Sequence, residues 1–137
     1  MRVTVIDAQG GGIGKAVVKA IKEKAPDCMV IAVGTNAVAT TAMLKAGADV
    51  GATGENAVVY NCAKAQVLIA PIGLTLANAM YGEISPAMAR AVGECEAIKI
   101  LIPVKQCSAK IAGLMDKPQA AYIQDAVEMA LNEMKNI

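Results

Sequence analysis

The chain of 137 residues contains no histidine, tryptophan or phenylalanine, and only three tyrosines. Without histidine it cannot form a Ser-His-Asp triad, a Cys-His pair or a histidine-ligated metal site. Surfaces that stack nucleic-acid bases need aromatic side chains, and a net charge of +1 provides no basic face for a phosphate backbone. The composition therefore predicts no metal site and no nucleic-acid partner.

Apolar residues make up 55% of the chain, with alanine the most abundant, so the core must consist of small and aliphatic side chains with methionine filling gaps. The first residues are typical of a strand and not of a signal peptide. No Cys-x-x-Cys pair occurs among the four cysteines, which are Cys28, Cys62, Cys95 and Cys107. We therefore expect a cytoplasmic protein with free thiols, most of them small buried side chains.

An uncharged run over residues 65–82 has the length of a membrane span. It is interrupted by Gln66, Pro71, Gly73 and Asn78, which indicate a strand, a turn and the start of a helix. An exposed turn in lipid would leave backbone groups unpaired. We therefore predict that the protein has no membrane segment.

The hydrophobic period alternates between that of a strand and that of a helix along the whole chain. We expect strands at residues 3–7, 28–33, 48–50, 66–70 and 98–104, with a short edge strand at 110–114, and helices at 13–25, 36–46, 55–65, 74–81, 85–93 and 118–134. Such alternation indicates a parallel sheet covered by helices. The predicted fold is a single Rossmann-like α/β domain over residues 1–137: a doubly wound, mostly parallel sheet of five or six strands with helices on both faces.

A glycine-rich loop, Asp7-Ala-Gln-Gly-Gly-Gly-Ile-Gly-Lys15, joins the first expected strand to the first expected helix. In doubly wound sheets, ligands bind beyond the carboxyl ends of the strands. Glycines allow the backbone to approach a ligand closely, and the amino terminus of a helix favours an anion. The loop therefore predicts a site for a phosphate or carboxylate, and its candidate ligand-binding residues are Gly10, Gly11, Gly12, Ile13, Gly14 and Lys15.

The loop matches known phosphate-binding patterns only in part. The dinucleotide fingerprint GxGxxG loses its third glycine, and the acidic residue that follows the second strand in such proteins is replaced by Gly34-Thr35-Asn36. Gly11–Lys15 resembles the variant phosphate loop of ParA-type ATPases (GKGGxGK[ST]), but Ala16 stands where a hydroxyl should bind Mg²⁺. This argues against NTP hydrolysis. A nucleotide or NAD(P) is the candidate cofactor, and a tight turn that serves helix packing alone is the alternative.

Three further segments are expected at the same edge of the sheet. Their candidate site residues are Thr35 and Asn36 after the second strand, Thr53, Glu55 and Asn56 in a second glycine-bearing loop, and Pro71 and Gly73 after a central strand. These side chains could wall a ligand. The alternative is that Asn36 and Thr53 only cap the helices that follow them.

The sequence identifies no catalytic residue, although Asp7, Lys15, Tyr81 and Glu83 carry groups that could take part in acid–base chemistry. The first hypothesis is therefore a protein that holds a small phosphate-bearing ligand. The alternative is a non-catalytic, partner-binding or homo-oligomeric module that has lost its cofactor, and a third hypothesis is an enzyme that uses some of these four side chains. Helix faces rich in alanine and methionine favour self-association, with a dimer expected.

The glycine loop and several later segments resemble a family of short bacterial proteins known only as a domain of unknown function (3842). The resemblance is carried by residues 5–15, 34–37, 43–49, 51–57, 71–73, 85–89 and 100–103. It implies a single-domain, Rossmann-like protein and assigns neither an activity nor catalytic residues. Family proteins often have glycine after the aspartate of the first strand, where this chain has Ala8.

Overall fold

Five short apolar runs form one parallel sheet in the computed structural model, which describes residues 1–105 and 108–137. The strands are β1 (Arg2–Asp7), β2 (Met29–Gly34), β3 (Val50–Thr53), β4 (Val67–Pro71) and β5 (Ile98–Ile102). Their order is β3-β2-β1-β4-β5, and each neighbouring pair is parallel. This confirms the predicted Rossmann-like α/β fold, with five strands.

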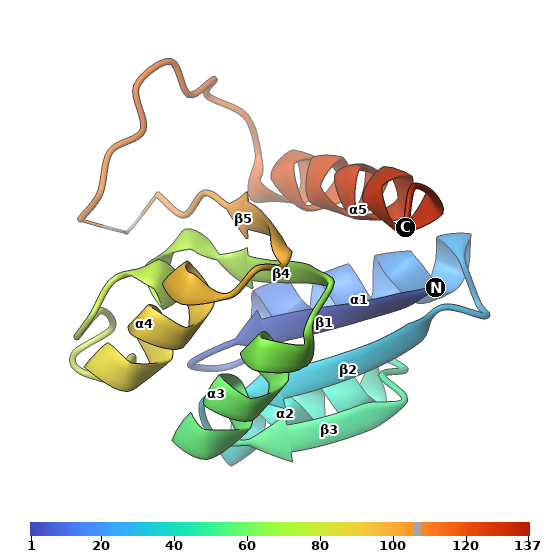
Figure 1. Cartoon of the computed structure of the whole chain (residues 1–137). Helices are drawn as coiled ribbons and strands as arrows, with labels where there is room; N and C mark the ends of the chain where they lie inside the picture. The colour runs from blue at the N-terminus through green and yellow to red at the C-terminus, as the bar shows by residue number, and fades with distance from the viewer. Residues whose placement is uncertain (106–107) are drawn as a thin grey trace.

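Helices cover both faces of the sheet (Figure 1). They are α1 (Gly12–Lys24), α2 (Ala37–Lys45), α3 (Glu55–Lys64), α4 (Pro86–Glu94) and α5 (Gln119–Lys135). Side chains of α1, α2 and α5 form a core on one face, and those of α3 and α4 form a second core on the other. Because both faces are covered, the side chains of β4 are buried throughout. Within the described residues, none of these helices has the length and apolar character that a membrane crossing requires.

The expected helix at residues 74–81 is wrong. A single 3-10 turn, η1 (Ile72–Thr75), follows β4, and the chain then forms tight turns. Asn78, Met80 and Tyr81 have positive φ angles of 65°, 58° and 57°, which a right-handed helix does not permit. The turns bring Ile84 into the core, where it is fully buried, and the amide of Asn78 donates to its carbonyl at 2.7 Å.

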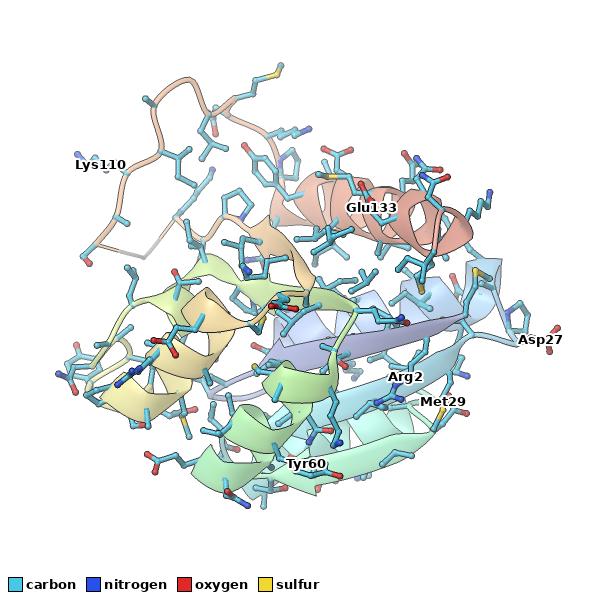
Figure 2. The ribbon with its side chains drawn as sticks, in the orientation of Figure 1. Arg2, Asp27, Met29, Tyr60, Lys110 and Glu133 are labelled. Carbon is cyan, nitrogen blue, oxygen red and sulfur yellow. The ribbon has the colours of Figure 1, made fainter. Side chains whose placement is uncertain are left out.

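One expected strand has different boundaries, and another does not form. The third strand begins at Val50, two residues later than predicted, because it pairs with β2 from Ile31 onward. No strand forms at residues 110–114: the segment is exposed, and the amide of Leu114 closes a turn onto the carbonyl of Ile111. Figure 1 shows this part of the chain looping away from the sheet before α5, and Figure 2 shows the Lys110 side chain out on the loop. With no neighbouring strand to pair with, its apolar residues stay in an open loop.

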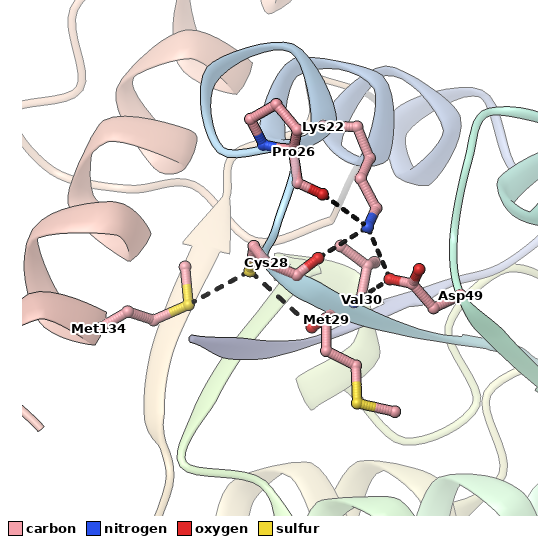
Figure 3. Close-up of polar contacts among 7 residues, drawn as sticks. All are labelled: Lys22, Pro26, Cys28, Met29, Val30, Asp49 and Met134. Atoms are coloured by element: carbon pink, nitrogen blue, oxygen red, sulfur yellow. Dashed lines mark hydrogen bonds and ion pairs between the residues drawn. The ribbon is translucent and has the colours of Figure 1, made fainter.

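A charged cluster ties together the amino ends of the strands (Figure 3). The ammonium of Lys22 donates to the carbonyl of Cys28 at 2.7 Å and to the carboxylate of Asp49 at 2.7 Å. The same carboxylate oxygen accepts the amide of Val30 at 2.8 Å. The hydrogen bond from Lys22, followed by that from Val30, lowers the pKa of Asp49. The cluster therefore joins the end of α1 to the starts of β2 and β3.

The described thiols behave as small buried groups. Cys28 and Cys62 are buried and free, and Cys95 is free and half-buried. Burial raises the pKa of Cys28, and burial, with a smaller effect from Cys95, raises the pKa of Cys62 to about 12. Both thiols are therefore protonated at neutral pH and unreactive. Cys107 lies outside the described residues.

Candidate functional site

The carboxyl ends of the strands bring four distant segments to one edge of the sheet. The chain winds from β1 through β2 to β3 in one direction, and β4 and β5 lie on the other side of β1. The winding therefore reverses between β1 and β4, which is the position where ligands bind in open α/β sheets. The loops after β1, β2, β4 and β5 all end at this edge.

The glycines after β1 serve two different purposes. Gly11 has a φ of +74°, and a Cβ there would lie 2.8 Å from the backbone of Ala39; a Cβ on Gly14 would lie 2.6 Å from the sulfur of Met43. These two glycines are required by packing against α2. A Cβ on Gly10 or on Gly12 would meet nothing within 4 Å. Half of the loop's glycines are therefore left unexplained by packing, and they face open space.

Three amides of this loop have no hydrogen-bond partner within the part of the chain that the structure describes: those of Gly10, Gly12 and Ile13. The last two belong to the first turn of α1, where backbone N–H groups lack partners within the helix. The amides of Ala8 and Gly14 instead donate to the two carboxylate oxygens of Asp7, at 2.8 Å and 2.6 Å. Asp7 thus closes the inner side of the loop and leaves its outer side open.

Asp7 is buried, with 4% of the residue exposed. This burial raises its pKa above the ordinary value, and the nearby charge of Glu83 adds to the rise. The hydrogen bonds from Gly14 and Ala8 oppose the rise without cancelling it. Asp7 therefore holds the loop at an electrostatic cost.

Glu83 comes from the loop after β4, and its carboxylate binds residues that follow β1 and β2. One of its carboxylate oxygens, Oε2, accepts the amide of Gln9 at 2.6 Å, the hydroxyl of Thr35 at 2.5 Å and the side-chain amide of Asn36 at 3.0 Å. Partial burial acts to raise the pKa of Glu83, but the hydrogen bonds from Thr35, Gln9 and Asn36 outweigh it and lower the pKa. The carboxylate is therefore charged at neutral pH.

A cleft of about 500 Å³ opens beside this network. It is lined by Gln9 after β1, Gly73 and Asn78–Tyr81 after β4, and Val104 and Ser108 after β5. Among the described residues, positive φ occurs outside glycine only at Gln9, Asn78, Met80 and Tyr81, and all four line this cleft. Strained backbone of this kind is concentrated at ligand sites in many proteins. Gln9 also belongs to the glycine loop, so the two features are continuous.

The other predicted residues are distributed unevenly. Gly73 lines the cleft, and Pro71 ends the buried strand β4. Lys15 lies on the exposed flank of α1 and lines a separate shallow groove with residues of α2. Asn36 caps α2, as the alternative interpretation of the sequence predicted, because its side-chain oxygen accepts the amide of Ala39 at 2.9 Å. Its side-chain NH2 group also donates to Glu83.

The second glycine-bearing loop does not reach the cleft. The expected cap at Thr53 is wrong: the residue before α3 is Gly54, whose φ of +103° suits only glycine, and the Thr53 hydroxyl pairs with that of Thr40 at 2.7 Å. Glu55 and Asn56 are exposed at the start of α3 and are absent from the lining of the cleft.

Sequence reasoning missed several residues that line the cleft: Gln9, Met80, Val104 and Ser108. It named Tyr81 and Glu83 only as possible acid–base groups, and Asn78 only as an interruption of the uncharged run, next to the glycine at position 82 that breaks the expected helix. That break was the one available signal, because asparagine and glycine mark positions that tolerate positive φ. Nothing in the pattern indicated that Glu83 would reach back to the loops after β1 and β2.

Comparison with known proteins gives structural likenesses and a family. The crystal structure of a dodecameric FMN-dependent UbiX-like decarboxylase from Escherichia coli O157:H7 is similar, with a TM-score of 0.47 and 16% sequence identity; the match covers 95% of this chain and 76% of that one. No curated protein matches the chain. The family model described as "Domain of unknown function (DUF3842)" matches residues 2–135, and the chain belongs to that family.

Proposed function

We propose that this protein binds a small phosphate-bearing ligand, a nucleotide or NAD(P), at the carboxyl edge of its sheet. The observation that carries the proposal is the open side of the glycine loop, where Gly10, Gly12 and Ile13 present unpartnered amides and a Cβ at either glycine would meet nothing within 4 Å. Backbone N–H groups at the start of a helix attract anions, and the helix dipole adds to the attraction.

The adjoining cleft has room for the rest of such a ligand. Its volume of about 500 Å³ lies within the range of small-molecule sites. Gln9 joins it to the glycine loop, so a phosphate at the loop and an organic group in the cleft would be continuous. Because Lys15 lies on the flank of α1 toward α2, backbone amides and not a side-chain cation would hold the phosphate.

A thermal-shift panel of FMN, adenine nucleotides, NAD, NADP and coenzyme A tests this proposal. A ligand present at 100 times its Kd stabilises the folded state by about 2.7 kcal/mol, which raises the melting temperature by several degrees. We expect at least one compound to do so. We expect Gly12→Val to remove the shift with little change in the melting temperature of the free protein, because the new side chain covers the amides and clashes with nothing.

Gly93→Val is the matched control. Gly93 lies in α4, and a Cβ there also meets nothing within 4 Å, so the variant makes the same change at a helix that does not border the cleft. It should retain the full ligand shift. Absence of a shift with every compound, or an equal shift in Gly12→Val, would overturn the proposal.

We also propose self-association, because apolar side chains are exposed on the loop before α5. Ile111, Leu114 and Met115 are 42%, 46% and 71% exposed, and Leu114 and Met115 border a hollow formed with Pro103 and Tyr122. Exposed apolar patches of this kind mark protein contacts. The alanine-rich helix faces of the sequence prediction are instead mostly used in the two cores.

Light scattering tests the dimer that this surface predicts. The wild type is expected at twice the mass of the 14.0 kDa chain, and Met115→Glu at the monomer mass, because a buried unpaired charge opposes association. Lys19→Glu, a charge change at an exposed position of α1, should leave the dimer intact. A wild-type monomer at micromolar concentration would contradict self-association.

A further inference from the structure

The position of Glu83 is set by the fold and not by its own flexible side chain. The next residue, Ile84, is fully buried, and its amide donates to the carbonyl of Ala79 at 3.2 Å. The amide of Glu83 itself donates to the carbonyl of Met80 at 3.2 Å. The carboxylate is thus held in place at the ends of β1 and β2 by the turns that form one wall of the cleft.

The residues that follow β2 include no carboxylate, and the carboxylate of Glu83 lies at that position instead. Doubly wound dinucleotide-binding domains carry an acidic residue there, which accepts a hydroxyl of the ribose. In this chain Gly34, the last residue of β2, is followed by Thr35 and Asn36, and both donate to Glu83. A carboxylate from a residue 47 positions away along the chain therefore stands at the end of this strand.

The two oxygens of this carboxylate are used very differently. Oε2 accepts all three hydrogen bonds, whereas Oε1 has no partner within residues 1–105 and 108–137. An ionised carboxylate has about four acceptor positions, so Oε1 keeps its full capacity for a donor. Thr35 and Asn36, which could otherwise bind a second phosphate, already donate to Oε2.

We infer that Glu83 determines ligand specificity by accepting a sugar hydroxyl through Oε1 and by excluding ligands that carry a phosphate at that hydroxyl. This inference rests on the proposed function and deepens it: the ligand is a nucleotide with a free ribose hydroxyl. A second phosphate would meet a fixed negative charge, and the donors that could neutralise it are already occupied. A hydroxyl instead supplies the donor that Oε1 lacks.

Calorimetric titration with NAD and NADP tests the inference, since the two differ only by one ribose phosphate. We expect the wild type to bind NAD at least tenfold more tightly than NADP. Glu83→Gln should reduce this preference to less than about threefold, because the charge that repels the phosphate is gone. Glu96→Gln removes an exposed charge before the amino end of β5, at the opposite edge of the sheet, and it should keep the wild-type preference.

A second variant covers the case in which Glu83→Gln fails to fold. Glu83→Asp keeps the charge but withdraws the oxygens, so NADP should stay excluded while NAD binds at least threefold more weakly. A purely structural role would weaken both dinucleotides equally.

Pyrophosphate separates the two proposals. Equal binding of NAD and NADP by the wild type, a preference for NADP, or binding of pyrophosphate but of neither dinucleotide would overturn the role of Glu83 alone. If pyrophosphate and every compound of the thermal-shift panel fail to bind, the proposed function is wrong, and the role of Glu83 is wrong with it.

Discussion

Gly34→Ala is expected to lower the melting temperature by about 10 °C. Gly34 is buried at the end of β2, and a Cβ there would lie 2.3 Å from the hydroxyl oxygen of Thr40 and 2.6 Å from its backbone nitrogen. The backbone nitrogen belongs to α2 and cannot turn aside. Overpacking of this kind costs about 1–3 kcal/mol.

The Thr40 hydroxyl makes this position more sensitive. It contacts the carbonyls of Asn36 and Ala52, each at 3.2 Å, and the hydroxyl of Thr53 at 2.7 Å. The hydroxyl has one hydrogen, so these contacts share a single donor. Displacing it weakens the links among α2, β3 and the loop after β2, at a further cost of about 1 kcal/mol. The total loss of about 3 kcal/mol corresponds to the expected 10 °C for a chain of this length.

Gly93→Ala is the control for the stability of Gly34→Ala. It places a methyl group in open space within α4 and removes the entropic disadvantage of a helical glycine, so it should stabilise the protein by about 0.5–1 kcal/mol. Differential scanning calorimetry measures both variants. A melting temperature of Gly34→Ala within 2 °C of the wild type would show that the end of β2 can open without cost.

Asp7→Ala is expected to reduce the free energy of unfolding by about 3 kcal/mol at acid pH. The substitution leaves the amides of Ala8 and Gly14 without the oxygens that they now contact at 2.8 Å and 2.6 Å. A buried donor without a partner costs about 1–3 kcal/mol. Asp27→Ala, at an exposed aspartate outside the hydrogen bonds described, should change stability by less than about 0.5 kcal/mol.

The loss caused by Asp7→Ala should depend on pH. The pKa of Asp7 is raised in the folded protein, mainly by burial, so the folded state holds its proton more tightly than the unfolded state. The stability that this proton contributes is complete below the ordinary pKa of 3.8 and is lost as the pH rises through the raised pKa. Urea unfolding at pH 4 and pH 7 should therefore give the larger loss at pH 4. A larger loss at pH 7 would mean that the ionised form is the stabilised one.

The central strands β1, β2 and β4 could be predicted because they are buried on both faces. A short continuous apolar run such as Val67–Pro71, ended by Pro71 and Gly73, is typical of a buried strand. The failed helix at residues 74–81 has the opposite character: its residues tolerate a helix locally, and the position of Ile84 in the core overrides that tendency. The strand expected at 110–114 failed because propensity does not provide a partner strand.

The candidate site was predictable only where its residues lie close together in the sequence. The glycine loop follows β1 directly, so its place at the carboxyl edge follows from the period of the sequence. Which glycines pack against α2 depends on the position of that helix. Only the structure shows that Gly11 and Gly14 contact it and that Gly10 and Gly12 face open space. The contact of Glu83 with Asn36 spans 47 positions and depends on the turns before Ile84, which no local pattern encodes.

The charged cluster around Lys22 lies at the amino ends of β2 and β3, and the cleft lies beyond the carboxyl ends of the strands. None of the residues of that cluster lines the cleft. Substitutions of the residues that line the cleft therefore leave the ammonium that ties α1 to β2 and β3 untouched. The contacts that anchor α1 and the candidate ligand site lie at opposite rims of one sheet, so each can be altered by substitutions that do not reach the other.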